Sequence, residues 1–414
     1  MKSRVKKITF AALGSILLSF YLYTCLRLGN DFRTFHDIGK FALEKANIYD
    51  PSPTTGMFVF YLPHFSLLMM PFGLLPVHVA GTLWFLLKIA GLVWFYKLTK
   101  SRLIQNSDNQ LPLWAALVPF ILVINPLNSD FKLGQVNLFV HLALIGSYVL
   151  LSESRKAGSA LLFVVSCVKV TPLIFLPYFI LKKEIRFLTW CFIWALFFMG
   201  ILTLWFGLQG AETILTNWWS ISSREKLGLS ALAYFENQSL LGLFARFAEN
   251  FPTTLIFSGQ LQIDQFSLPA YKAWAYGFSA ILLGLICIFT MISARSKHKL
   301  HSDLIFSLFF IVMLLASPDT RNAHLMHLLF PVLVLWQVFY SRLQGATLGR
   351  IGLAISGLGL ILTSQDLIGK KLNHLLRENS HQTAILLITF FIMVLVFFKQ
   401  KNDSKTRTIS TLDT

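Results

Sequence analysis

The stretch that decides the fold is residues 187–208, FLTWCFIWALFFMGILTLWFGL. It has no charged residue, and it is as long as the roughly 20 residues that a helix needs to cross a bilayer. Similar runs recur along the 414-residue chain, which is 55% hydrophobic and 13% charged, whereas soluble domains carry about 25% charged residues. Because lipid offers no hydrogen-bond partner to open backbone groups, such spans must be helical. The sequence therefore predicts an all-α polytopic membrane protein.

The predicted spans number about ten, with additional re-entrant or short segments. They form a single membrane domain over residues 1–401, followed by a polar cytoplasmic tail at 402–414. The first run lacks a small-residue cleavage site and is interpreted as an uncleaved anchor rather than a signal peptide. We place the full spans at 8–28, 78–97, 111–127, 135–151, 187–208, 270–294, 303–316, 323–341, 348–363 and 383–399.

The net charge of +17 reports topology rather than a polyanionic partner such as nucleic acid. The predicted cytoplasmic segments hold 21 of the 36 Lys and Arg residues but only six of the 19 Asp and Glu residues. This asymmetry is typical of a multi-pass protein of the cell membrane. It predicts that both termini are cytoplasmic and that loops 29–77 and 209–269 lie on the outer face.

Two segments are predicted not to cross fully. The apolar pair 157–168 and 173–181 has basic residues on both flanks, so we expect a re-entrant hairpin with Lys169 near its apex. Segment 58–75 is broken by Pro63 and Pro71 and is interpreted as re-entrant or interfacial. Lys88 is also in mid-span, where no neighbouring motif suggests a function, and pairing or snorkelling is expected.

Asp31 is the strongest catalytic candidate, because it follows the first span directly and lies beside the predicted outer membrane surface. A carboxylate held there can take a proton from an acceptor next to a lipid-borne substrate. His36 and Asp37 are secondary candidates for the same role or for a metal ligand. A solvated loop acid is the alternative for each carboxylate.

Cationic and amide side chains on the same predicted face are candidates for substrate binding. A lysine inside a membrane is costly and suggests function, although a structural lysine that snorkels is the alternative. Arginine suits bidentate phosphate binding, with a plain surface arginine as the alternative, and amides near a helix N-terminus favour anions or sugar hydroxyls, with an ordinary cap as the alternative. The predicted phosphate ligands are Lys169, Arg246, Arg321 and His324, and the predicted substrate-binding amides are Gln135, Asn137, Asn237 and Gln238.

No cofactor is expected. His324 and His327 are three residues apart but have few carboxylates nearby, so a divalent metal is the less favoured alternative.

In their order along the chain, these motifs resemble glycosyltransferase family 87, whose members are polytopic enzymes of the GT-C type. The resemblance covers roughly residues 30 to 330 and rests on an ordered set of short motifs: Asp31-Phe32, Tyr49 with Pro51, Tyr61-x-Pro63, Gly134-Gln-x-Asn137, Lys169-x-x-Pro172, Asn237-Gln-Ser, Arg246, Ser317-Pro and His324. The sequence departs from the family pattern after Ser317-Pro, where a tryptophan is expected before the histidine, and in the short loop between Tyr49 and Tyr61.

The resemblance implies transfer of a sugar, often mannose, from a polyprenyl-phosphate donor to a lipid- or glycan-linked acceptor on the outer face. It also implies that Tyr61 is a substrate-binding residue. Asp31 would be the general base, and direct attack would invert the anomeric centre. Three alternatives remain: a transporter or flippase of a lipid-linked sugar, a ligase or polymerase with a diphosphate-linked donor, and a non-catalytic scaffold.

Overall fold

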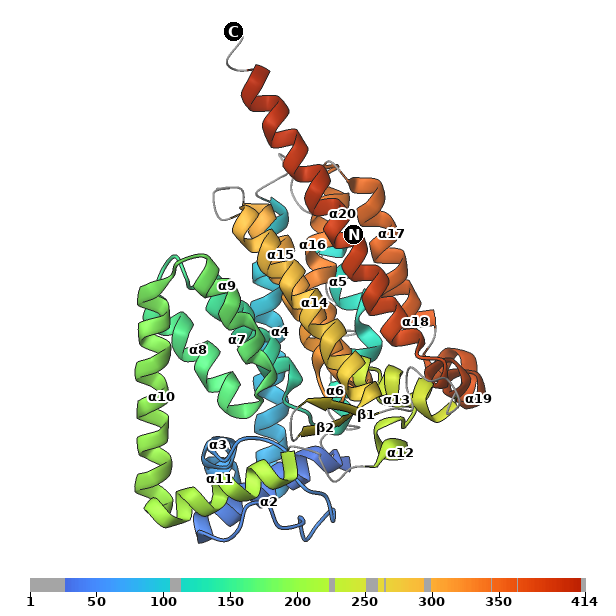
Figure 1. Ribbon diagram of the computed structural model, residues 1–414. Coiled ribbons are helices and arrows are strands. Elements are labelled where there is room, and N and C mark those ends of the chain that lie inside the picture. The colour runs from blue at the N-terminus through green and yellow to red at the C-terminus, as the bar shows by residue number, and fades with distance from the viewer. Residues whose placement is uncertain are drawn as a thin grey trace, which may run out of the picture.

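The computed structural model describes residues 27–104, 113–222, 228–250, 260–263, 266–293, 299–343, 345–362 and 364–410. Within these ranges the chain is a bundle of helices with one small hairpin, in which β1 (Gln260–Ile263) pairs antiparallel with β2 (Phe266–Pro269). Apart from that hairpin, the predicted all-α polytopic architecture is confirmed (Figure 1).

Six helices are long and apolar enough to cross a bilayer, and the number rises to eight if each of two bent pairs is one span. The prediction of about ten full spans is therefore not confirmed for the described residues, and the predicted span 8–28 lies almost entirely outside them. The six are α4 (Val77–Ile104), α10 (Ile185–Phe206), α14 (Ala270–Ser293), α15 (Lys299–Ala316), η2 (Asn322–Leu328) continued by α16 (Leu329–Tyr340), and α20 (His381–Ser410).

The first bent pair is α5 (Leu113–Leu122) and α6 (Ile124–Leu133), whose axes differ by 63°. Pro126 lacks the amide hydrogen that would bond to the carbonyl of Leu122, and its ring crowds that carbonyl, so one straight helix cannot continue through it. The second pair joins α17 (Ala346–Leu353), η3 (Ala354–Leu358) and α18 (Gly359–Leu362) to α19 (Gln365–Glu378) with a bend of 92°.

Predicted span 135–151 is a shorter helix, α7 (Asn137–Val149). At 1.5 Å per residue it is about 20 Å long, less than the thickness of about 30 Å of a bilayer core. α7 is therefore too short to cross the bilayer as a full span.

The predicted re-entrant hairpin is helical and is formed by α8 (Arg155–Val168), η1 (Thr171–Phe175) and α9 (Leu176–Leu181). Its two ends return to the same end of the bundle, at the top of Figure 1, where α10 begins. Lys169 lies at the turn between α8 and η1. The chain thus enters and leaves the hairpin on one side.

The opposite end of the bundle carries α2 (Asn30–Glu44), α3 (His64–Gly73) and α11 (Leu208–Ser222), and we call it the α2 end (Figure 1). α2 and α3 pack closely because Gly39 and Gly73 have no side chains; a Cβ on Gly39 would lie 2.3 Å from the carbonyl oxygen of Met69. With only ten residues, α3 does not cross, as predicted for segment 58–75. The short helices α12 (Leu229–Leu232) and α13 (Leu240–Asn250) complete this part of the chain.

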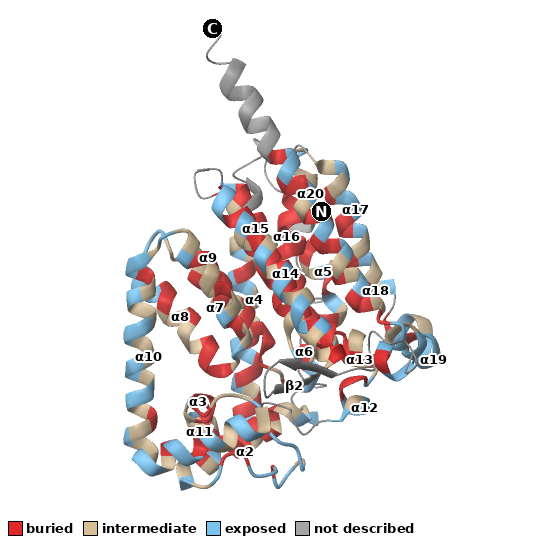
Figure 2. Ribbon diagram, in the orientation of Figure 1, coloured by how far each residue is buried: buried red, intermediate tan, exposed pale blue. Residues whose placement is uncertain are grey.

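The core follows the two most buried spans, α15 and α16, whereas α10 is mostly exposed at the edge of the bundle (Figure 2). Phe306, Phe309 and Phe310 of α15 are fully buried and pack against Phe175 of η1. This contact anchors the hairpin turn to the core. At the other end of the chain α20 continues to Ser410, so the helix extends into the predicted tail.

Candidate active site

Asp31 lies in the first turn of α2 and is partly buried. Its Oδ2 accepts a hydrogen bond of 2.6 Å from Nε2 of Gln135. Burial raises the pKa of Asp31 above its usual value of 3.8, while the Gln135 hydrogen bond and the charges of Lys169 and Arg321 act in the opposite direction. A carboxylate of raised pKa, held beside cations, is suited to accept a proton.

Four other polar residues of the family motifs join Asp31 in one cluster. The Tyr61 hydroxyl donates to Oε1 of Gln135 at 3.1 Å, so Gln135 bridges the phenol and the carboxylate. Lys169 Nζ donates to Oδ1 of Asn137 at 2.6 Å and lies 5.3 Å from the centre of the Tyr61 ring. We call these five residues the Asp31 cluster: Asp31, Tyr61, Gln135, Asn137 and Lys169.

Local sequence explains how these side chains are presented. Gly134 adopts a φ of 72°, which ends α6 and lets the chain turn into α7 with Gln135 and Asn137 on that turn. α8 ends at Val168 because Pro172 cannot donate a hydrogen bond to the Val168 carbonyl. The extended backbone of Lys169 then projects its ammonium group from the hairpin turn towards Asn137.

Arg321 and His324 lie at the start of η2. The Arg321 side chain is about half exposed and pairs with Asp319 at 3.2 Å and with Glu236 at 3.7 Å. His324 Nδ1 accepts the backbone N–H of Arg321 at 2.9 Å. Arg321 also acts on Asp31 electrostatically, so it is an outlying cation of the Asp31 cluster. The hydrogen bond to His324 instead fixes the backbone at the start of η2.

Arg246 is placed differently from the prediction that it binds a donor phosphate. It is 5% exposed, and Nη1 donates to the carbonyl oxygens of Ala233, Tyr234 and Asn237. Nε and Nη2 donate to the Ser380 hydroxyl at 3.0 and 2.7 Å. The guanidinium therefore ties the loop before α13 to the start of α20, and this geometry favours a structural role.

Replacing Arg246 with Ala should lower stability without a selective effect on the chemistry. A single buried polar group left without a partner costs about 1–3 kcal/mol, and this change leaves several. Thermal unfolding in detergent should show the loss, with the exposed Arg350→Ala variant unchanged. An Arg246→Ala protein of normal stability and a raised donor KM would instead restore the phosphate-binding role.

Asn237 and Gln238 are buried in the same structural network and do not line the Asp31 cluster. Asn237 Oδ1 accepts from the backbone N–H groups of Ser239 and Thr320, and Gln238 Nε2 donates to the carbonyl of Arg377. Their amides join α13 to the loop before η2 and to α19. The arrangement does not favour the predicted substrate-binding role for either residue.

His36 and Asp37 also face away from the cluster. Asp37 Oδ2 accepts hydrogen bonds of 2.6 Å from the hydroxyls of Ser52 and Thr54, and His36 Nε2 lies 2.9 Å from the Leu75 carbonyl oxygen. They hold the segments on either side of α3 against α2, so the geometry does not favour them as substitutes for Asp31. Within the described ranges, no three His, Cys, Asp or Glu side chains come together as a metal site.

An apolar cavity of about 750 Å³ adjoins the cluster. It runs between α3 and α4 on one side and α7 and α8 on the other, from Val136 and Val168 at its inner end to Leu150 and Glu153. Val136 precedes Asn137 and Val168 precedes Lys169, so the lining of the cavity includes the chain neighbours of two cluster residues, neither of which lines it. Along α7 it extends over about 20 Å.

The sequence did not suggest a buried histidine pair below the cluster. The rings of His141 and His327 lie 5.5 Å apart, and both nitrogens of His141 have no hydrogen-bond partner among the described residues. The Asn137 amide nitrogen is likewise buried without a partner there. A histidine near the middle of predicted span 135–151 is the signal that could have found this pair.

Comparison with known proteins identifies the family. A model of glycosyltransferase family 87 matches residues 58–318, more than half of the chain. No curated protein and no solved structure matches the chain. The matched range contains four residues of the cluster, Tyr61, Gln135, Asn137 and Lys169, whereas Asp31 precedes it and joins them through its contact with Gln135. The chain belongs to glycosyltransferase family 87 and is a membrane glycosyltransferase.

Proposed function

We propose that the protein transfers a sugar, mannose or another hexose or pentose, from a polyprenyl-phosphate donor to a lipid- or glycan-linked acceptor. The reaction takes place on the outer face of the cell membrane, with both termini in the cytoplasm. The observation that carries the proposal is the Asp31 cluster, in which a carboxylate and an ammonium group flank the same tyrosine and amides.

Asp31 is the general base in this proposal. It takes the proton of the acceptor hydroxyl as the oxygen attacks the anomeric carbon, and the bond from that carbon to the donor phosphate breaks. A phosphate is a good leaving group and needs no general acid. One attack from the face opposite the phosphate inverts the anomeric centre.

Lys169 stabilises the negative charge that develops on the leaving phosphate. Arg321 adds a second positive charge near the same carboxylate. The open amide donor of Asn137, held beside the Lys169 ammonium, suits an oxygen of the phosphate or of the sugar. The cluster thus offers a base on one side and donors on the other.

The apolar cavity supports a lipid-linked donor. Its lining includes Val136 and Val168, the chain neighbours of Asn137 and Lys169, and in this proposal a phosphate held by these two residues has its hydrocarbon chain between α4 and α7. Each buried methylene contributes about 0.8 kcal/mol, which favours a long apolar chain in a cavity of this kind.

Filling the cavity should therefore discriminate between donors by chain length. Ala143 on α7 lines it, and Ala143→Trp should raise KM for a long-chain donor by about 10-fold or more, since a few lost methylene contacts suffice for that change. A donor with a chain of two isoprene units should be used as well as by wild type. Leu204→Trp, on the exposed face of α10, is the matched control. An equal rise in KM for both donors would show that the cavity does not hold the lipid chain.

The function is tested by incubating the purified protein in lipid vesicles with radiolabelled polyprenyl-phosphate sugars and a crude envelope-lipid extract. Labelled product of inverted configuration supports the proposal. Product from diphosphate-linked donors alone would indicate a ligase or polymerase. Movement of lipid across the vesicle without sugar transfer would indicate a flippase, and the absence of both would overturn the assignment of donor.

A further inference from the structure

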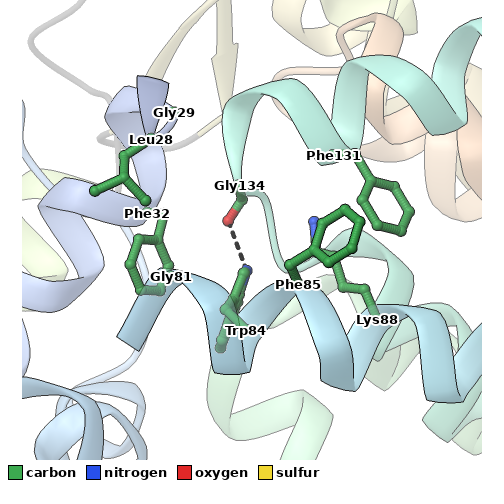
Figure 3. A pocket seen from close by; sticks show the side chains of 9 residues that line it. All are labelled: Leu28, Gly29, Phe32, Gly81, Trp84, Phe85, Lys88, Phe131 and Gly134. Carbon is green, nitrogen blue, oxygen red and sulfur yellow. Dashed lines mark hydrogen bonds between the residues drawn. The ribbon is translucent and has the colours of Figure 1, made fainter. Parts of the chain in front are cut away.

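Lys88 of α4 and Asp130 of α6 form an ion pair in the interior of the bundle. Lys88 Nζ lies 2.7 Å from Oδ2 of Asp130, and the two side chains are 1% and 0% exposed. Figure 3 shows the Lys88 side chain reaching from α4 towards the end of α6, beside Phe131 and Gly134. Neither residue belongs to the Asp31 cluster.

Such a pair is costly, and its contribution to stability is small or unfavourable. Two charges removed from water regain through their attraction little more than they lose in hydration, and well-packed apolar residues of similar size are often as good. The best-attested use of a buried ionic pair is to fix one arrangement of the elements that carry it. We therefore expect Lys88 and Asp130 to fix the position of the backbone that they contact.

They hold the turn between α6 and α7. Lys88 Nζ also donates to the backbone carbonyl of Asp130 at 2.9 Å, and that oxygen accepts the Gln135 N–H at 3.0 Å. One helical turn earlier on α4, Trp84 Nε1 donates to the carbonyl of Gly134 at 3.0 Å (Figure 3). Trp84 and Lys88 are four residues apart and lie on one face of α4, so a single helix fixes both ends of the turn.

The same turn positions the base. Its next residue, Gln135, donates the 2.6 Å hydrogen bond to Asp31. The backbone of α2 also packs directly on the turn: a Cβ on Gly134 would lie 2.5 Å from Cβ of Phe32, and one on Gly29 would lie 2.2 Å from the Leu133 carbonyl. A shift of the turn would therefore change both the position of Gln135 and the support of Asp31.

We infer that Trp84, Lys88 and Asp130 form a clamp on α4 and α6 that positions Gln135 against Asp31 for proton transfer. These three are positioning residues that act through the α6–α7 turn. Lys88 and Asp130 are buried and line no part of the apolar cavity, whereas Trp84 also lines the cavity proposed for the donor chain. The inference rests on the proposed function for its link to turnover, and on the hydrogen bonds of the turn for its structural part.

The first test is the double variant Lys88→Met/Asp130→Leu, which removes both charges and leaves no lone buried ion. Loss of positioning should lower kcat by about 10–100-fold, as for a misplacement of about 1 Å, with donor KM within about twofold of wild type. The matched control is Tyr148→Phe, which removes a partly buried hydrogen bond of 2.7 Å to Asp303 near the C-terminal end of α7. That control should keep normal kcat.

A double-mutant cycle separates positioning from a general loss of structure. In a Gln135→Ala background the clamp has nothing to position, so Lys88→Met/Asp130→Leu should cost much less there than in wild type. Fully additive losses, or an unchanged kcat in the folded double variant, would overturn the inference. If the double variant does not fold, Trp84→Phe removes one hydrogen bond to the turn and should lower kcat by a smaller factor. Because Trp84 also lines the apolar cavity, this variant is judged by kcat and by amide protection of residues 130–140, and normal values of both would overturn the inference.

Hydrogen exchange gives a readout that needs no substrate. Peptides over residues 130–140 should lose amide protection in the clamp variant and keep it in Tyr148→Phe. Normal protection of that segment in the clamp variant would overturn the structural part of the inference. Absence of turnover in wild type would instead count against the proposed function, while the exchange result would still decide the clamp.

Discussion

Replacing Asp31 with Asn should lower turnover by about 10²–10⁴-fold, the usual contribution of a general base, and leave donor binding nearly unchanged. Asn has the same shape, and its carbonyl oxygen can still accept the hydrogen bond from Gln135 that Asp31 Oδ2 accepts at 2.6 Å. The loss should therefore appear in kcat. It is measured by product formation at saturating donor, beside direct binding of labelled donor in vesicles.

The matched control is Glu44→Gln, which neutralises an exposed acid at the other end of α2 and should have no effect on either measurement. The pH profile gives a second readout of the same assignment. Because burial raises the pKa of Asp31, protonation should switch the base off at a pH above its usual value of 3.8, and kcat/KM should fall as the pH drops through that raised pKa. Wild-type turnover in Asp31→Asn would remove this carboxylate from the mechanism.

Replacing Lys169 with Met should lower kcat by about 10²–10³-fold, the range for the loss of one preorganised group at a developing charge. Met keeps most of the side-chain volume but cannot donate to Asn137, which Lys169 contacts at 2.6 Å. The effect should be larger on kcat than on KM, because charge on the phosphate grows as the bond to the sugar breaks. Turnover with the same polyprenyl-phosphate donor measures it.

Two comparisons sharpen this result. Lys169→Arg keeps the charge in a different geometry and should recover part of the activity. Lys132→Met removes an exposed positive charge near the end of α6 and should be neutral. If Lys169→Met lost only stability, with normal kcat in the folded fraction, Lys169 would be an anchor of the hairpin turn rather than a phosphate ligand.

Lys169 shows what could be predicted from sequence alone. A charged residue inside an apolar run, with Pro172 after it and basic residues on both flanks, indicated a hairpin turn, and the structure has one there. The gathering of Asp31, Tyr61, Gln135 and Asn137 followed from assigning all their loops to one end of the bundle. The structure places these residues in contact, whereas the choice of membrane face remains a prediction.

Arg246 and the partner of Lys88 show why the rest could not be predicted. The sequence predicts that Lys88 pairs or snorkels, and it is paired, but the sequence does not identify Asp130 as its partner. Spacing reveals that an arginine lies in a loop, but not that three carbonyl oxygens surround its Nη1 atom. Lys88 and Asp130 are 42 residues apart, and Asp130 lies on α6, beyond the 63° bend that hydropathy does not report. A local sequence pattern does not specify the direction that the chain takes after a bend at proline.

The hairpin of α8, η1 and α9 also has a consequence for biosynthesis. A lysine in the interior of a helix that must be threaded across the bilayer costs about 2.5–3.5 kcal/mol during insertion. Because both ends of this hairpin lie at the same end of the bundle, Lys169 reaches the interior of the bundle while its basic flanks stay at one end. The turn packs on Phe306, Phe309 and Phe310 of α15, more than a hundred residues later in the chain, so the ribosome completes α15 before the hairpin has its final support.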